Sequence, residues 1–520
     1  MPPQPPSALA LDETTAPPSG AAESAPVVYT HQQILRVVTG IMLCILLAAL
    51  DQTVVIPAVP AIARDLNAFG HLSWIVSAYL LTSTAATPIY GKLSDIYGRR
   101  ALLLPAIALF IVASALCALA QTLPQLIVFR ALQGLGGAGL MSMAQAAIAD
   151  VVSPRERGRY QGYMASMWGL ASVGGPVVGG WMTDNLSWHY VFWINLPLGL
   201  AAMALCNRAL RLLPVRRIPA RIDYIGAALL TTGVTGWLLV LSWGGSEFPW
   251  MSAPIVGLFA AGAVLFGLLY LHERRFADPI LPPRLFANPV FLRGVILAFF
   301  TSIGLLGATF LLPLFFQLVR GAAASGSGLL VMPYLLANVA GAYTGGQMVR
   351  RSGRTKAVIV SGLGAATLGF ALQATMGHAT PSWVVAATMV VVGAGTGVCL
   401  PSVLVVVQNA ADRRDVGAAT GSLLFLRSLG GAFGSTLVGA LLTARFASRM
   451  AAAGVAGPID LGSAQNPTVP AAVSQAALAS GFSLAFGVCS ALSLVAVVIA
   501  LGMRDVTLRS TVDEPTAVGH

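Results

Sequence analysis

The chain contains fourteen long apolar runs, and this feature constrains its fold more than any other. The runs are bounded by charged residues, prolines or clusters of glycine. A helix needs about 20 mostly apolar residues to cross the hydrocarbon core of a bilayer, which is roughly 30 Å thick. We therefore predict fourteen membrane-spanning helices, numbered in chain order, at about residues 34–62, 72–91, 101–121, 124–149, 160–183, 189–210, 223–243, 251–271, 289–318, 327–349, 357–377, 382–408, 416–443 and 479–503.

The composition favours an all-α polytopic membrane protein. Hydrophobic residues make up 56% of the 520 residues and charged residues only 9%, too few to keep the surface of a soluble globule wet. The net charge of +11 comes from short basic clusters between apolar runs, so we do not expect nucleic acid as a partner. The five cysteines stand singly inside apolar runs, so we expect no disulfide framework, no metal site and no cofactor.

The basic residues set the orientation, because cytoplasmic loops collect Lys and Arg. With the N-terminus in the cytoplasm, 24 of the 30 Lys and Arg residues fall on the cytoplasmic side and 4 on the other, and Arg130 and Arg427 lie inside predicted helices. An even number of spans then places both termini in the cytoplasm. Residues 1–33 lack the features of a signal peptide and are expected to form a disordered cytoplasmic tail, and residues 506–520 form a second tail.

An internal echo divides the chain. GKLSDIYGRR (Gly91 to Arg100) follows the second span, and GQMVRRSGRTK (Gly346 to Lys356) follows the tenth, with the same seven-residue step between glycines. Transporters are commonly built from duplicated bundles. We therefore predict two pseudo-symmetric six-helix bundles, at residues 34–212 and 284–505, with two inserted linker helices within residues 213–283.

Several motifs agree with one family. The first cytoplasmic loop follows G-x3-D-x2-G-R-R through Gly91, Asp95, Gly98, Arg99 and Arg100. The fourth span carries L-x3-R-x2-Q-G at Leu126, Arg130, Gln133 and Gly134, and the fifth carries Gly162, Gly175, Pro176, Gly179 and Gly180. At these residues the chain resembles the major facilitator superfamily, specifically its fourteen-span drug/proton antiporter branch, over about residues 34–505.

Two further segments extend the resemblance with small departures. LDQTVV (Leu50 to Val55) is similar to the LDxTVV signature of the branch, although Ile56 stands where Asn is common. SWHYVFWINLP (Ser187 to Pro197) resembles SWRWIFFINVP, with His189 in place of Arg, and the fifth span has Ala171 where Gly is usual. The resemblance implies the fold of that superfamily and proton-driven export of drugs. The resemblance also makes accessory efflux proteins candidate partners.

Asp51 is the first candidate for proton coupling. About 20 Å separates it from the cytoplasmic edge of the first span, so it lies near the bilayer centre. A carboxylate there is costly, and we expect it to face the bundle interior, where removal from water disfavours its charged form and allows proton exchange near neutral pH. A purely structural aspartate, tied to a neighbouring helix, is the alternative.

Arg130 is the second candidate. It lies about 9 Å below the outer edge, at nearly the depth of Asp51, so the two side chains are expected to pair or communicate. The alternative is that Arg130 satisfies backbone carbonyls opened by the glycines of the fifth span. Gln133 and Arg427 are candidate cavity residues, and Arg427 lies about 15 Å into the thirteenth span. The sequence leaves open whether Arg427 has a structural role or a role in transport.

Two glycine-containing segments suggest moving parts. In the loop of Gly91, Asp95, Gly98, Arg99 and Arg100, the charges suggest a lock that holds the cytoplasmic side closed, with simple positive-inside anchoring as the alternative. In the fifth span, the glycines lack side-chain bulk on one face and Pro176 removes a backbone hydrogen bond. Gly162, Gly175, Pro176, Gly179 and Gly180 are therefore candidates for a hinge or a tight seam between halves, with ordinary small-residue packing as the alternative.

The energy source follows by exclusion. The chain has two lysines, Lys92 and Lys356, and neither stands in a G-x4-G-K-[ST] sequence, so no P-loop is present. A proton moving down 100 mV supplies about 2.3 kcal/mol. We predict a secondary transporter of the cell membrane that exports small amphipathic compounds in exchange for protons, with membrane lipid as its other partner.

Other functions stay open at this point. An exporter of one endogenous metabolite or a proton-coupled importer would use the same fold, and a non-transporting sensor lacks any recognisable signalling domain. The six histidines are scattered, so an enzyme is not expected. No second carboxylate lies as deep as Asp51, which favours neutral or monocationic substrates over dications. Residues 449–475 are expected to form an outer loop, to which the sequence assigns no role.

Overall fold

The computed structural model describes residues 30–66, 72–212, 222–245, 247–322, 324–455 and 470–505. Most of the two predicted tails and the central part of the predicted outer loop, residues 456–469, lie outside the described residues. Apart from one isolated bridge between Gly244 and Phe248, the regular elements of the described residues are helical. The prediction of an all-helical chain is confirmed.

The described residues form seventeen α-helices. They are α1 (His31–Asp65), α2 (Leu72–Tyr97), α3 (Arg99–Ala118), α4 (Leu123–Val151), α5 (Pro154–Asn185), α6 (Tyr190–Trp193), α7 (Asn195–Ala209), α8 (Tyr224–Trp243), α9 (Ala253–Glu273), α10 (Pro283–Ala287), α11 (Pro289–Leu318), α12 (Ala324–Leu330), α13 (Met332–Ser352), α14 (Thr355–Gln373), α15 (Ser382–Asn409), α16 (Val416–Ala452) and α17 (Ala471–Leu501), with 3-10 turns η2 (Leu210–Leu212) and η3 (Arg413–Asp415).

The predicted spans all lie on helices, but not all of these helices have the composition of a membrane span. The sixth span divides into α6 and α7, and the tenth into α12 and α13. Among the described residues, eleven helices are long and apolar enough to cross a membrane. The other three predicted spans correspond to α2, α5 and α13. These three helices meet helices of the opposite group at glycines, so part of their surface faces protein rather than lipid.

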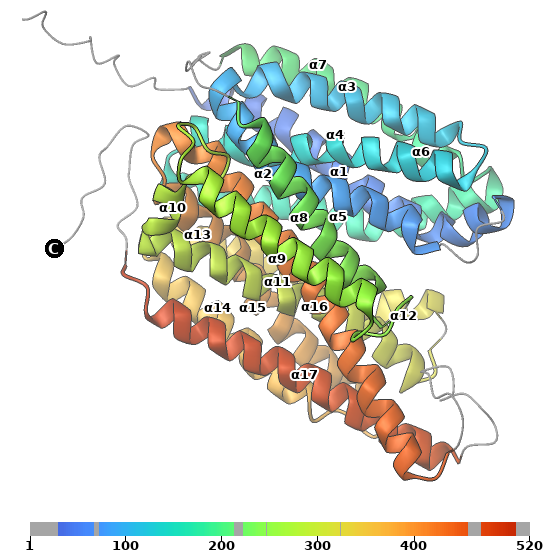
Figure 1. Ribbon diagram of the computed structural model, residues 1–520. Helices are drawn as coiled ribbons and strands as arrows, with labels where there is room; N and C mark the ends of the chain where they lie inside the picture. The colour runs from blue at the N-terminus through green and yellow to red at the C-terminus, as the bar shows by residue number, and fades with distance from the viewer. Residues whose placement is uncertain are drawn as a thin grey trace, which may run out of the picture.

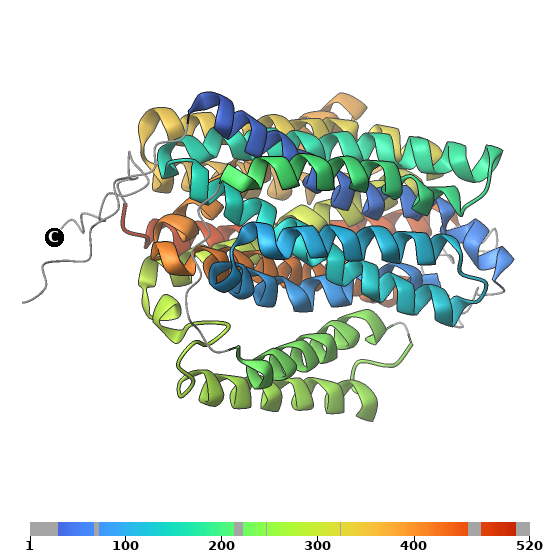
Figure 2. The same ribbon diagram turned by 90° about the horizontal axis from the view of Figure 1, so that it is seen from above.

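Two groups of helices make up the body of the protein. In Figure 1, α1–α7 gather in the upper part and α11–α17 in the lower part, and α8 and α9 lie in front of both. Figure 2 shows α8 and α9 as a separate pair along one side. Helix α1 begins and α17 ends at the same end of the bundle, which we call the termini end. The two groups lie close together there and diverge towards the opposite end (Figure 1).

Each group has its own apolar core, and the outer surface is apolar as well. Ile41, Phe110 and Leu140 are buried in the first group, and Phe315 and Phe486 in the second. Large apolar side chains are also exposed on outward helix faces, among them Val264, Leu268, Trp383, Leu494 and Val498. Exposed apolar surface of this extent suits contact with lipid rather than with water.

Candidate functional site

Asp51 is the centre of a buried polar network in the first group. Its side chain is fully buried on α1 and accepts three hydrogen bonds. Arg130 of α4 donates from Nη1 to Oδ2 over 2.8 Å. Gln133 of α4 and Asn195 of α7 donate from their amide nitrogens to Oδ1 over 2.9 and 2.8 Å. A carboxylate held by one cation and two amide donors is well satisfied as the charged form.

Arg130 is held on all sides by the first group. Its Nη1 also donates to Oε1 of Gln133 over 2.7 Å, and its Nε donates to the carbonyl of Ile75 over 3.1 Å. The guanidinium carbon lies 4.7 Å from the ring centroid of Tyr79 and 5.8 Å from that of Phe192. The carbonyl that Arg130 contacts belongs to Ile75 of α2, so the alternative that Arg130 satisfies carbonyls of the glycine-rich fifth span is wrong.

Two members of this network escaped the sequence analysis. Ser114 of α3 accepts a hydrogen bond from Nε2 of Gln133 over 2.7 Å and donates to the carbonyl of Phe110. Asn195 has a second polar atom, Oδ1, which is buried without a hydrogen-bond partner among the described residues. Both are polar residues inside otherwise apolar spans. Burying a polar side chain in a membrane span is costly, so this feature of the sequence could have identified both as candidates.

Each charge of the buried pair of Asp51 and Arg130 is balanced by the other. Removing one partner of a buried ion pair typically costs about 3–5 kcal/mol, because the other charge is left uncompensated. A proton on Asp51 would have the same kind of effect, since it removes the negative charge that faces Arg130. Loss of that charge would weaken the contacts that join α1, α4 and α7.

A second polar cluster joins the two groups at the termini end. Asp95, near the end of α2, accepts hydrogen bonds from the backbone amides of Gly417 and Ala418 over 2.9 and 2.8 Å. These amides belong to the first turn of α16, whose partial positive charge favours an anion. Asp95 thus caps a helix of the opposite group.

Arg99 holds this cap in place. Its Nη2 lies 2.7 Å from Asp95 Oδ1, its Nε donates to Asp150 over 2.8 Å, and its Nη1 donates to Ser94. Asp95 lies beyond the predicted second span. Burial raises the pKa of Asp95 to about 6, and Arg99 and the two amides oppose this shift, so the carboxylate is mainly ionised at pH 7.

Arg100 does not join the cluster. Its guanidinium donates to Oδ1 of Asn207 in α7 over 2.7 Å, within its own group. The predicted charge lock therefore needs this correction: the structure places Asp95 and Arg99 at the contact between groups but directs Arg100 away from it.

The glycines of the echoed segments have matching positions. A Cβ on Gly91 would clash with the carbonyl of Gly417 in α16, and a Cβ on Gly346 would clash with the carbonyl of Gly158 in α5. The second glycine of each step has a positive φ, 87° at Gly98 and 67° at Gly353. Only glycine adopts such a backbone readily, so both segments have the same physical requirement: close backbone approach, then a sharp turn.

The fifth-span residues separate into two sets. A Cβ on Gly162 would lie 2.9 Å from Cα of Tyr343, which belongs to the opposite group. Gly175 and Gly179 instead pack against α1 of their own group, and Gly180 has nothing within 4 Å of the place a Cβ would take. Helix α5 runs continuously through Pro176. Of the five predicted residues only Gly162 abuts the other group, so the prediction of a seam between halves at Gly175, Pro176, Gly179 and Gly180 is wrong.

The two candidate cavity residues lie in different places. Gln133 belongs to the Asp51 network described above. Arg427 lies on α16 in the second group, and it lines a different pocket. Sequence reasoning grouped them, but the structure does not bring them together.

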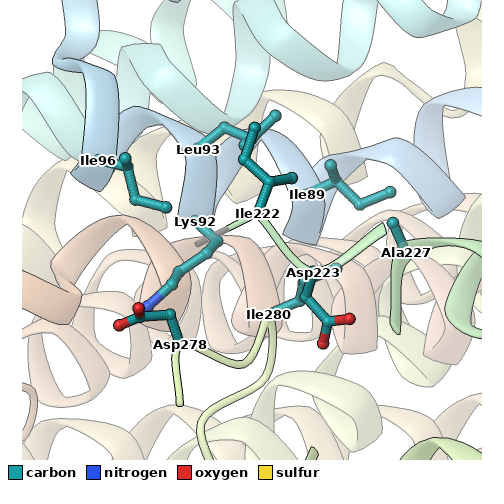
Figure 3. A pocket seen from close by; sticks show the side chains of 9 residues that line it. All are labelled: Ile89, Lys92, Leu93, Ile96, Ile222, Asp223, Ala227, Asp278 and Ile280. Atoms are coloured by element: carbon teal, nitrogen blue, oxygen red, sulfur yellow. The ribbon is translucent and has the colours of Figure 1, made fainter. Parts of the chain in front are cut away.

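A pocket also lies between α2 and the α8–α9 pair (Figure 3). Its polar lining residues are Lys92, Asp223 and Asp278, and in Figure 3 the Lys92 side chain extends towards Asp278. Asp223 caps α8 by accepting from the amide of Gly226 over 2.7 Å, and Nε2 of His272 lies 2.7 Å from the same carboxylate. The ends of α8 and α9 therefore lie beside the segment of α2 that carries Asp95. Among the described residues, no group of three or more His, Cys, Asp or Glu side chains is placed to hold a metal ion.

An all-helical body in two groups, with an apolar outer surface and a buried ion pair in one group, is typical of a polytopic membrane transport protein. The profile of the Major Facilitator Superfamily matches residues 41–435. The chain therefore belongs to the major facilitator superfamily, and it is a multi-pass membrane transporter, not an enzyme.

Several curated relatives are similar over most of the chain. The multidrug transporter protein MdtP of Bacillus subtilis is 38% identical over 408 residues, which cover 78% of this chain and 75% of that protein. Multidrug resistance protein 3 of the same organism is 34% identical over 447 residues, with coverages of 85% and 86%. An uncharacterised transporter of the superfamily from Mycobacterium tuberculosis is 35% identical over 488 residues, with coverages of 92% and 71%.

Solved structures share the fold. The human organic anion transporter MFSD10 superimposes with a TM-score of 0.62 at 16% identity, covering 90% of this chain and 99% of that one. The proton:xylose symporter XylE gives a TM-score of 0.61 at 17% identity, covering 90% and 95%. At these identities the likeness concerns the fold alone.

Proposed function

We propose that this protein exports small amphipathic drugs or toxic compounds in exchange for protons, by alternating access across the cell membrane. The observation that carries the proposal is the fully buried pair of Asp51 and Arg130, with Gln133 and Asn195 completing the carboxylate's hydrogen bonds. An ionisable side chain inside a membrane bundle is costly, and a proton relay is the usual reason for keeping one.

Proton binding at Asp51 would drive the cycle. The neutral carboxyl no longer balances the charge of Arg130, so the state that keeps the two in contact loses stability relative to its alternative. Release of the proton to the other side restores the pair. A ligand or proton shifts the equilibrium only by its difference in affinity for the two states, and the loss of a buried ion pair supplies such a difference.

The contact of the two groups at the termini end supports alternating access. In the proposed topology this end faces the cytoplasm, and the capping of α16 by Asp95, together with the glycine contacts, keeps it closed. Opening would break the two amide–carboxylate hydrogen bonds and separate Gly91 from Gly417. Asp95 and Arg99 are the lock residues in this proposal, with Gly91 and Gly98 allowing close approach and the turn.

The proposed topology has fourteen spans, with both termini in the cytoplasm. Eleven helices meet the criteria of length and composition, and α2, α5 and α13 supply the other three spans. The domains follow as two six-helix bundles at residues 34–212 and 284–505, with the linker helices α8 and α9 in the inserted segment 213–283. This arrangement matches the fourteen-span drug/proton antiporter branch.

The substrate class rests on the relatives and on the charge pattern. Two similar Bacillus subtilis proteins carry names of multidrug transport or resistance. Asp51 is the sole carboxylate that the sequence places so deep in a span, which favours neutral or monocationic amphiphiles over dications. Accessory efflux proteins are further candidate partners.

Inside-out vesicles test the proposal. The chain is expressed in cells that lack their own efflux pumps, a pH gradient is imposed, and ethidium uptake and ethidium-dependent proton release are followed. We expect both signals with the native chain, loss of both with Asp51→Asn at equal protein level, and retention with Asp184→Asn, which changes an exposed aspartate on α5. Coupling that survives Asp51→Asn would assign the proton to another group.

A further inference from the structure

Arg427 is a cation without a counter-charge. It lies 11 residues after the start of α16, which places it about 16 Å along the helix and near the middle of a membrane. Residues 289–411 and 416–459 contain no Asp or Glu, so α11, α13, α14, α15 and α16 carry no carboxylate of their own. The nearest acid on its own segment, Asp415, is bound by Arg284 over 2.9 Å.

The side chain of Arg427 also lacks polar contacts. Within the described residues, neither a hydrogen bond nor an ion pair reaches its guanidinium, although the side chain is partly buried. Arg99, Arg130 and Arg284 all have a carboxylate partner. An arginine is always charged in a protein, and an unpaired charge away from water is costly unless a ligand balances it.

An unused hydroxyl lies on the same pocket. Thr301 of α11 is almost fully buried, and its Oγ1 has no hydrogen-bond partner among the described residues. Threonines elsewhere in these helices donate to the carbonyl four residues earlier, as Thr309 and Thr367 do over 2.8 Å. Thr301 makes no such hydrogen bond, so its hydroxyl is available to donate to a bound group.

The pocket that these two residues share is small and otherwise apolar. It lies between α11, α15 and α16, has room for about one water molecule, and is completed by Ala298, Cys399, Leu400, Val403 and Leu423. It is too small for a whole amphiphile, so only the head group of one could reach these two side chains.

We propose that Arg427 and Thr301 bind the anionic head group, such as a carboxylate, of an amphipathic substrate. The guanidinium supplies charge and two parallel donors, the hydroxyl supplies a third, and the apolar walls suit the adjoining carbon atoms. The depth of the pocket separates it from lipid head groups. The inference rests on the proposed transport function and extends its substrates from neutral and cationic amphiphiles to amphipathic acids.

Equilibrium binding tests this assignment without a proton gradient. The full chain is purified in lipid nanodiscs, and the affinities of 1-pyrenebutyrate and its uncharged amide, 1-pyrenebutyramide, are measured by fluorescence. We expect the acid to bind the native chain at least about tenfold more tightly, because hydrogen bonds to a charged group are worth that factor or more. Arg427→Gln should bring the acid-to-amide ratio close to one, and Arg427→Lys should keep it above that of Gln.

Two more variants separate the head-group contact from folding. Thr301→Val keeps the shape of the side chain and should lower the ratio by roughly 2–10-fold. Arg445→Gln removes another arginine of α16, whose Nε donates to Ser480 over 3.0 Å, and should keep the native ratio. Equal binding of acid and amide by the native chain, or a native ratio in both Arg427→Gln and Thr301→Val, would overturn the inference.

The same measurements distinguish this inference from the proposed function. A high acid-to-amide ratio without pH-driven ethidium transport would retain the anion site and reject proton-coupled export. Ethidium transport with a ratio of one would retain export and reject the anion site.

Discussion

Asp51→Asn is the change that most directly probes the buried network. The substitution keeps the size of the side chain but removes its charge, and it turns one oxygen into an amide donor. All three groups that contact Asp51 are donors, so the new amide must face either Arg130 or the pair of Gln133 and Asn195. The variant therefore loses at least one hydrogen bond and leaves a buried cation unbalanced.

The magnitude can be worked from the contacts. Breaking a buried pair by removing one partner costs about 3–5 kcal/mol, and we expect that loss in the free energy of unfolding of Asp51→Asn. Arg130→Met should show a loss of similar size, because it leaves the carboxylate without its cation. In the double variant neither charge remains, so its loss should be smaller than the sum of the single losses by about 2–3 kcal/mol.

The assay is a reversible unfolding titration in mixed micelles, followed by tryptophan fluorescence, on the native chain, both single variants and the double variant. Asp184→Asn serves as the matched control, since the side chain is exposed, and should stay within about 0.5 kcal/mol of the native value. Additive losses in the double variant would contradict this coupling, because they would mean that Asp51 and Arg130 contribute independently to stability.

Three other substitutions, two of them with a control variant, test the contact between groups and the packing of α5. Asp95→Ala should make the first amides of α16 exchange hydrogen at least about tenfold faster, and unchanged exchange would contradict the capping role. Gly346→Ala should abolish vesicle transport, because its Cβ meets a carbonyl of α5, whereas Gly364→Ala, with open space around it, should not. Gly175→Ala should lower the free energy of unfolding by about 1–3 kcal/mol and Gly180→Ala by under about 0.5 kcal/mol; the reverse order would reject the packing assignment.

The depth of a residue could be predicted from the sequence, because a helix advances by a fixed rise per residue. This is why Asp51 and Arg130, from different spans, were expected at one level, and the structure places them 2.8 Å apart. Lateral neighbours could not be predicted in this way. Ser114 and Asn195 lie inside apolar spans, and nothing in their spacing shows that α3 and α7 turn them towards Asp51.

The sequence also could not predict which of two adjacent arginines takes part in the charge lock. Arg99 and Arg100 are adjacent in the sequence and equally basic, but successive residues of a helix point about 100° apart. Arg99 therefore faces Asp95 and Asp150, while Arg100 faces Asn207. The motif predicted that charges meet at this segment, and only the packing of α3 decided which arginine takes part.

The sequence alone determined that lipid is the solvent, where the helices run, and which polar residues are costly enough to need a purpose. These properties depend on local hydropathy and on the length of each run. The hydrogen-bond partners depend on how distant segments pack: the hydrogen bond from Asn195 to Asp51 joins residues 144 apart in the sequence, and the cap that Asp95 places on α16 joins residues more than 320 apart. Such contacts depend on which face each helix turns to its neighbours, and packing of all the helices together fixes that.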